Sequence, residues 1–203
     1  MNNPSAIVLA AGTSSRMGTP NKLLLDFNGV PLVRHVVMRI LDSNPYETIV
    51  VTGYQEEQVM KSLAGLDLSF VHNPRYEQGM TSSIQAGVAV ARGEGFMICL
   101  SDMYAMNAER YKELMQFFMK RLPDDELTIC LPFYEGKRGN PVIFSTAFRE
   151  EILNHQDPEG CRKIVQDNSA HLYKLQMASP EVLKDLDTPE DYRQAGNIVG
   201  KTD

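Results

Sequence analysis

Several features that define particular protein classes are missing from this chain of 203 residues. No apolar run approaches the ~20 residues that a membrane-spanning helix needs, and no long basic stripe marks a nucleic-acid groove. The three cysteines lie far apart and form no CxxC pair, which predicts a reduced compartment and no zinc site. Residues 1–5 lack the charged and then apolar plan of a signal peptide. We therefore expect a cytoplasmic protein that binds neither a membrane nor a nucleic acid.

The composition is that of an ordinary globular protein. A hydrophobic fraction of 43% is enough for a substantial core, and the length predicts one domain over residues 1–203. The formal net charge is −6. An acidic protein that binds a polyanion must gather its cations locally or recruit a metal ion. The positions of individual basic residues therefore matter more than their number.

Strand and helix patterns alternate along the chain. Short apolar, partly β-branched runs predict strands at residues 6–10, 48–51, 68–71 and 96–100. Helical spacing predicts helices at residues 31–41, 55–63, 81–91 and 108–121, with Pro31 at the first helical position. Further strands are expected at residues 126–133, 140–144, 172–176 and 182–186, and a closing helix at residues 188–195. The pattern predicts a mostly parallel sheet with helices on both faces. Ligands bind beyond the carboxyl ends of such strands.

The stretch from Ala6 to Lys22 has the features of a phosphate-binding loop. The first strand ends in small residues, and the loop that follows carries Gly12, three hydroxyls, Arg16, Gly18 and Lys22. Glycines allow the backbone N–H groups to approach an anion, and the two cations add fixed positive charge. The alternative is a Gly/Ser turn with two solvated cations.

The spacing excludes two familiar phosphate loops. A Walker loop needs four residues between its glycines and a lysine directly after the second. Here five residues separate Gly12 from Gly18, and Lys22 comes later. A dinucleotide fingerprint needs three spaced glycines, which this stretch does not have.

The run Leu9-Ala10-Ala11-Gly12, followed by Ser-Ser-Arg-Met-Gly and Lys22, resembles the signature loop of the molybdopterin nucleotidyltransferase family. The resemblance is to its molybdenum cofactor cytidylyltransferase-like members, within the glycosyltransferase-A superfamily, and it extends to about Tyr192. It implies a Rossmann-like three-layer α/β/α sandwich of the nucleotide-diphospho-sugar transferase type. It also implies that Leu9, Ala10, Ala11, Gly12 and Lys22 bind the nucleotide, and that Arg16 and Lys22 are catalytic.

Asp102 follows the apolar strand at residues 96–100 directly. A carboxylate at the carboxyl end of a strand is well placed to hold Mg²⁺, which prefers one or two carboxylates together with phosphate oxygens and water. The alternative is a helix cap or a surface turn. The family usually shows Asp-Met-Pro here, and this chain has Asp102-Met103-Tyr104. The resemblance implies that Asp102 also contacts the nucleotide.

The stretch from Asp185 to Asp191 resembles the family's Asp-Ile-Asp-Thr-Pro-Glu-Asp motif. The resemblance implies that Asp187 is the second metal ligand. The alternative is helix capping by Asp187 or Thr188, and both can hold together. Strand alternation is taken to point Asp185 elsewhere.

Two further segments resemble family motifs. The first is Gly79-Met80-Thr81-Ser82-Ser83, and its resemblance implies that Gly79, Ser82 and Ser83 contact the nucleotide. This resemblance also favours CTP over GTP. The alternative is an ordinary helix whose N-terminus is capped by a hydroxyl. The segment from Gly136 to Val142 has Asn140 in place of the family's histidine. Lys137 and Arg138 could meet an acceptor phosphate or form a solvated hairpin tip.

The resemblance implies Mg²⁺-dependent transfer of CMP from CTP to a phosphate-bearing acceptor, most simply molybdopterin, with release of pyrophosphate. A recipient molybdoenzyme is a further expected partner. A phosphate monoester is already largely ionised at neutral pH because its second pKa is about 6, so the reaction requires no general base. The alternatives are transfer to a sugar phosphate or another small phosphate acceptor, and a chaperone that delivers a finished cofactor to a molybdoenzyme.

Overall fold

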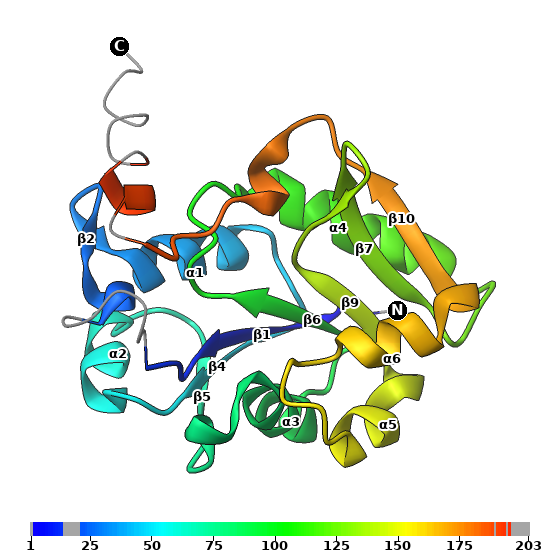
Figure 1. The fold of residues 1–203 in the computed structure, drawn as a ribbon, viewed down its shortest axis with the longest axis horizontal. Helices are drawn as coiled ribbons and strands as arrows, with labels where there is room; N and C mark the ends of the chain where they lie inside the picture. The colour runs from blue at the N-terminus through cyan, green and yellow to red at the C-terminus, as the bar shows by residue number, and fades with distance from the viewer. Residues whose placement is uncertain (1, 14–20, 189, 194, 196–203) are drawn as a thin grey trace.

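The computed structural model describes residues 2–13, 21–188, 190–193 and 195, and its centre is one sheet (Figure 1). The strands lie in the order β10-β7-β9-β6-β1-β4-β5, and β8 pairs with β7. Their bounds are β1 Ser5–Ala10, β4 Thr48–Thr52, β5 Ser69–His72, β6 Gly95–Leu100, β7 Ile129–Tyr134, β8 Lys137–Arg138, β9 Val142–Ser145 and β10 Leu172–Gln176. β1 is parallel to β4 and β6, β4 to β5, and β7 to β10. β9 is antiparallel to both β6 and β7.

Helices cover both faces of this sheet (Figure 1). One hydrophobic cluster joins the sheet to α1, α2 and α4, and a second joins it to α3, α5 and α6. The bounds are α1 Leu32–Asp42, α2 Glu56–Ser62, α3 Met80–Val90, α4 Ala108–Arg121, α5 Arg149–Asn154 and α6 Arg162–Asp167. The predicted three-layer fold with a mostly parallel sheet is confirmed.

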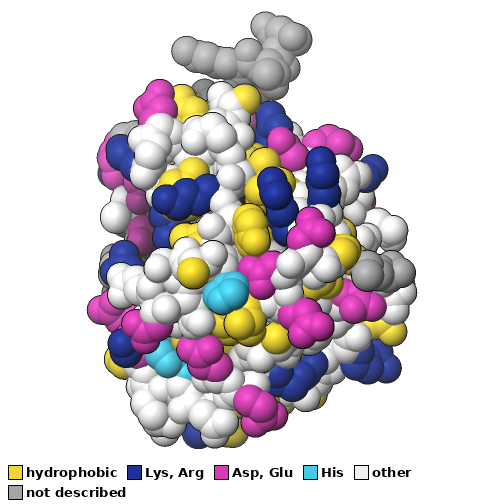
Figure 2. Space-filling view, turned by 90° about the vertical axis from the view of Figure 1, so that its right-hand side faces the viewer, with side chains coloured by type: hydrophobic (Ala, Val, Ile, Leu, Met, Phe, Trp, Pro, Cys, Tyr) yellow, Lys and Arg dark blue, Asp and Glu magenta, His cyan; other side chains and the backbone are white. Residues whose placement is uncertain are grey.

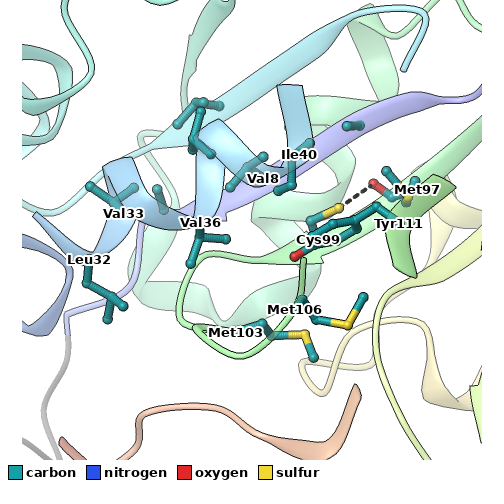
Figure 3. Packing of buried hydrophobic residues seen from close by; sticks show 14 of the residues in the cluster. Val8, Leu32, Val33, Val36, Ile40, Met97, Cys99, Met103, Met106 and Tyr111 are labelled. Atoms are coloured by element: carbon teal, nitrogen blue, oxygen red, sulfur yellow. Dashed lines mark hydrogen bonds between the residues drawn. The ribbon is translucent and has the colours of Figure 1, made fainter. Parts of the chain in front are cut away.

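Alternation along β1 produces the two clusters. Val8 packs with Val36 and Ile40 of α1 on one face (Figure 3), whereas Ile7 belongs to the cluster on the other face. On that second face α3 approaches the sheet closely. A Cβ at Gly87 would lie 2.3 Å from Cγ2 of Ile7, so the glycine permits this approach. The alternation therefore determines which face of the sheet each group of helices covers.

The chain between β1 and α1 contains a small hairpin. A 3-10 helix spans Lys22–Leu24, and β2 Asp26–Phe27 pairs with β3 Val30–Pro31 around the turn at residues 28–29. Asn28 and Gly29 have positive φ, as such a turn requires. Pro31 was expected at the first helical position, but it is the N-cap of α1 with ψ 140°. The helix therefore begins one residue later.

The strand expected at residues 182–186 is not present. Pro180–Leu183 forms a 3-10 helix with proline in its first turn, and no strand is assigned at residues 184–187. The backbone N–H of Leu186 instead donates to the Asp102 carbonyl at 3.2 Å. Apolar alternation at Val182 and Leu186 thus reflects burial of an irregular segment. Residues 190–193 and 195 are helical; Pro189, like Arg16 and Gly18, lies outside the described residues.

Among the described helices, none combines the length and the apolar character that a membrane span requires. On the face that Figure 2 shows, Lys and Arg side chains are interspersed with Asp and Glu side chains. The charges on this face are therefore mixed in sign.

Candidate active site

The described part of the site is built where β1 and β6 end. These strands are parallel neighbours in register, with Leu9 opposite Leu100, so the segments that follow them leave the sheet at the same edge. The Ser101 hydroxyl donates to the Leu9 carbonyl at 2.6 Å and ties the two exits together. Gly12 and Asp102 are consequently held on neighbouring segments.

A cavity of about 630 Å³ lies at this edge. Its size is within the ~300–1,000 Å³ typical of small-molecule sites. Of the residues predicted to bind nucleotide or metal, the following line it: Leu9, Ala11, Gly12, Lys22, Gly79, Ser83, Asp102 and Asp187. Ala10 and Ser82 are not part of its lining, and Arg16 lies outside the described residues.

Lys22 joins two carboxylates from distant parts of the chain. Its Nζ donates to Oδ2 of Asp102 at 2.6 Å and to Oδ1 of Asp187 at 3.0 Å. The side chains of Lys22 and Asp102 are 14% and 13% exposed, so the first ion pair is largely shielded from solvent. The Asn21 side chain accepts from the Leu23 N–H and begins the short helix that directs Lys22 inward.

The electrostatics of the cavity favour a cation. Burial lowers the pKa of Lys22, but Asp102 and Asp187 raise it by more, so the pKa lies above its ordinary value and the ammonium remains charged. Burial, followed by repulsion from Asp102 and Asp187, raises the pKa of Asp185. Lys22 thus contacts two carboxylates, and Asp185 and Glu77 also line the cavity.

Sequence reasoning missed Asp185, which also lines the cavity. The error came from treating residues 182–186 as a regular strand whose alternation turned this side chain away. The spacing contained a usable signal, since residues two apart in an extended segment project to the same side. Asp185 and Asp187 stand in that relation, and both reach the cavity.

The carboxylates suit a divalent cation. Oδ1 of Asp102 is buried and has no hydrogen-bond partner among the described residues, while its other oxygen contacts Lys22. No group of three or more His, Cys, Asp or Glu residues in the described part of the chain is placed to bind a metal ion. Mg²⁺ is commonly coordinated by one or two protein carboxylates, with phosphate oxygens completing its coordination.

The start of α3 forms another wall of the cavity. Asn73 is 1% exposed, and its amide donates to the hydroxyls of Ser82 and Ser83 at 2.9 and 3.0 Å. The Ser82 hydroxyl is within donating distance of the backbone carbonyls of Arg75 and Gly79. Ser82 is therefore engaged with the protein, and Ser83 is the hydroxyl residue of this pair that lines the cavity.

The segment around the β7–β8 turn lies beside this site. Arg138 and Asn140 line a smaller cavity and Lys137 does not, although Lys137 and Arg138 are both exposed. Of the predicted basic pair, Arg138 therefore belongs to the lining of this cavity and Lys137 does not.

Comparison with known proteins identifies the family of this chain. The family model described as MobA-like NTP transferase domain matches residues 6–173. The molybdenum cofactor cytidylyltransferase of Escherichia coli is 25% identical over 187 residues, which cover 92% of each chain. A nucleotidyl transferase from Methanothermobacter has a similar fold, with a TM-score of 0.87 and 23% identity over the full length of both chains. A Mycobacterium tuberculosis protein solved in complex with manganese has a TM-score of 0.74 and 20% identity, covering 95% of this chain and 97% of that one.

Proposed function

The chain belongs to the MobA-like NTP transferase domain family and is a nucleotidyltransferase, and from this premise we propose that it transfers CMP from CTP to a phosphate-bearing small molecule. Pyrophosphate is the second product. Molybdopterin is the acceptor we propose first, because the Escherichia coli relative carries the name molybdenum cofactor cytidylyltransferase. A molybdoenzyme would then receive the nucleotide-extended cofactor.

The observation that supports this proposal most directly is the contact of Lys22 with Asp102 and Asp187 in a cavity that Gly12 also lines. A glycine-containing turn, an ammonium and two carboxylates are the groups that a metal-bound triphosphate needs. The carboxylates come from segments 80 and 165 positions away from Lys22.

In the proposed reaction an acceptor phosphate oxygen attacks the α-phosphate of CTP. A new P–O bond forms as the bond to the β-phosphate oxygen breaks, and pyrophosphate leaves with that electron pair. The nucleophile is already ionised because its second pKa is about 6, so positioning and charge neutralisation supply the catalysis. Lys22 stabilises the negative charge of the triphosphate and of the leaving group. Arg16 is proposed for the same role from its place in the loop.

Asp102 and Asp187 are the residues we propose as ligands of Mg²⁺. The buried Oδ1 of Asp102 supports this assignment, since a carboxylate oxygen without a hydrogen-bond partner is costly unless a cation approaches it. When bound, such an ion neutralises charge on phosphate oxygens. The manganese complex of the Mycobacterium tuberculosis protein is consistent with a divalent cation in this fold.

A second candidate acceptor class is a sugar phosphate or another small phosphate ester. The observation in its favour is Asn140, which replaces the histidine expected at this position and lines the cavity beside the nucleotide site. An amide keeps hydrogen-bonding ability but loses the imidazole's ability to titrate. This change affects the choice of acceptor and leaves the nucleotide site as it is.

A panel of nucleoside triphosphates tests the proposal. Pyrophosphate release is measured for CTP, GTP, UTP and ATP with Mg²⁺, each with and without molybdopterin and with a sugar 1-phosphate. We expect release that requires CTP and molybdopterin together. Release with another triphosphate would overturn the assignment of CTP, and release only with the sugar phosphate would favour the second acceptor class.

A further inference from the structure

A second cavity of about 280 Å³ adjoins the nucleotide cavity. The two share Met80 and Leu100 in their linings. β9 begins at Val142, which pairs with Ile98 of β6, so this second cavity lies one strand away from Asp102 along the same edge. A molecule bound there would lie beside a ligand bound in the first cavity.

Two guanidinium groups line this second cavity. Arg138 comes from β8 and Arg162 from the first position of α6. Arg138 is exposed, the Arg162 side chain is 66% exposed, and both residues line the same cavity. In the described part of the chain no carboxylate is within ion-pair distance of Arg138, and Arg162 makes a 3.6 Å contact with Glu159, which is exposed and also lines the cavity. Two cations that line one cavity, one of them without an acidic partner among the described residues, favour an anionic ligand.

The rest of the wall is mainly apolar. Its apolar members are Met80, Ile84, Ile98, Leu100 and Val142, and Gly139, Asn140 and the carboxylate of Glu159 also line it. Cys161 also lines the cavity, but burial raises the pKa of its thiol to about 12, so it remains neutral. The cavity therefore presents positive charge at one part and a hydrophobic surface at another.

Specific contacts fix the backbone just before Arg162. The Thr81 hydroxyl donates to the Asp157 carbonyl and accepts from the Gly160 N–H at 3.0 Å. Gly160 has a φ of 77°, and a Cβ there would lie 3.1 Å from the Met80 sulfur. The segment before α6 is thus fixed against the start of α3, which also borders the nucleotide cavity.

Arg138 is positioned by an equally close contact. A Cβ at Gly139 would lie 2.7 Å from the Val182 carbonyl oxygen, and the Asn140 N–H donates to that same oxygen at 3.0 Å. The backbone after Arg138 therefore packs directly on the 3-10 helix at Pro180–Leu183. Both guanidiniums are carried by segments with defined packing partners.

We propose that this second cavity binds the acceptor, and that the acceptor is an amphipathic phosphate ester. Its anionic group lies between Arg138 and Arg162, and its apolar body lies on the wall formed by Ile84, Ile98 and Val142. The identity of the ligand as the acceptor rests on the proposed nucleotidyl transfer, whereas anion binding by the two arginines does not.

Phenyl phosphate is a suitable probe because it combines a phosphate with an apolar ring. Its binding is measured by calorimetry on the full chain, with and without Mg²⁺ and a non-hydrolysable CTP analogue that fills the nucleotide cavity. Arg138→Gln and Arg162→Gln are compared with Lys137→Gln, a matched control on the same strand. Circular dichroism checks that each variant is folded.

We expect wild type to bind phenyl phosphate in the millimolar range, in keeping with a ligand of few atoms. Each arginine variant should weaken this binding about 10-fold, the loss typical of one hydrogen bond to a charged group. The Lys137→Gln control should bind as wild type does. Inorganic phosphate and phenol should each bind more weakly than phenyl phosphate, since each lacks one half of the recognition.

Equal binding by wild type and both arginine variants would overturn the proposal. So would displacement of phenyl phosphate by the CTP analogue, which would place the probe in the nucleotide cavity. If CTP fails to stabilise the protein while phenyl phosphate still depends on the arginines, the proposed nucleotide is wrong and the anion site stands.

Discussion

At the scale of single residues, Lys22 is the residue that connects the separate segments of the candidate site. Its ammonium contacts carboxylates from two other segments, and those carboxylates keep its pKa high despite burial. A fixed charge of this kind is already oriented when substrate arrives, so little reorganisation is needed as negative charge develops.

We predict that Lys22→Ala lowers turnover by about 100-fold, the loss typical of removing one preorganised charged or donor group. The measurement is pyrophosphate release at saturating CTP. Lys61→Ala, which removes an exposed lysine of α2, is the control and should retain wild-type turnover. Wild-type turnover in Lys22→Ala would remove this residue from the mechanism.

The two neighbouring serines provide a sharper comparison. Ser83→Ala should weaken CTP binding by about 3- to 10-fold, the cost of one neutral hydrogen bond, because Ser83 lines the cavity. Ser82→Ala should leave CTP affinity unchanged and lower the stability of the protein, because its hydroxyl bonds to the backbone and to Asn73. Calorimetry with CTP and urea unfolding measure the two effects. The reverse assignment of effects would contradict this division.

Much of the candidate site could be expected from sequence, because its residues occur in short local patterns. Gly12, Lys22, Asp102 and Asp187 were named from motifs, and the structure places them around one cavity. Sequence alone does not distinguish Ser82 from Ser83, since that difference depends on the contacts of the Ser82 hydroxyl with backbone carbonyls and on which side chain lines the cavity. That Arg138 and Arg162 line one cavity likewise depends on folding, because these residues are far apart along the chain.

At the scale of elements, continuous apolar runs predicted β1, β4 and β6, and helical spacing predicted α4, to within one residue at each end. These elements are long and strongly patterned, so burial dictates their apolar positions. The strand expected at residues 182–186 was wrong because an irregular segment can also bury alternate side chains. Val182 and Leu186 are both buried without any strand pairing.

Glu47 links three elements at the opposite end of the sheet from the cavity. Its carboxylate accepts from the Ser5 hydroxyl at 2.8 Å, from the Arg92 N–H at 2.7 Å and from the Arg92 guanidinium at 3.1 Å. Burial alone would raise the pKa of Glu47, but these donors lower it overall. The contacts join the start of β1, the residue before β4 and the chain after α3.

We predict that Glu47→Gln lowers the free energy of unfolding by about 1–2 kcal/mol near neutral pH, as expected for loss of charge-assisted hydrogen bonds. A depressed pKa stabilises the fold above the ordinary value of 4.5, and this contribution is lost as pH falls through the folded-state pKa. The difference between variant and wild type should therefore shrink below about pH 4. Urea unfolding at several pH values measures it. A difference independent of pH would exclude the carboxylate charge as its cause.

At the scale of the whole molecule, the cavity unites the two ends of the described chain. Lys22 lies near the beginning and Asp187 lies 165 positions later, yet their side chains are in direct contact. A ligand that binds all of these groups at once stabilises the complete arrangement by mass action, because the unfolded chain cannot bind it in this way.

We predict that Asp187→Ala weakens the combined binding of CTP and Mn²⁺ at least about 10-fold, the lower end of what disturbing a metal site costs. A thermal-melt titration measures this as a smaller rise in Tm at each concentration. Asp67→Ala removes an exposed carboxylate that is not part of the cavity lining, and it should show the wild-type shift. An undiminished shift in Asp187→Ala would show that this carboxylate is not a ligand.

The antiparallel strand β9 lies between β6 and β7 and so separates the sheet into two halves, one on the β6 side and one on the β7 side. One half supplies the groups around Lys22, and the other supplies the surface around Arg138. Substitutions at Arg138 or Arg162 change a wall to which Lys22, Asp102 and Asp187 do not belong, because the two cavities have only Met80 and Leu100 in common. The two surfaces can accordingly be altered one at a time.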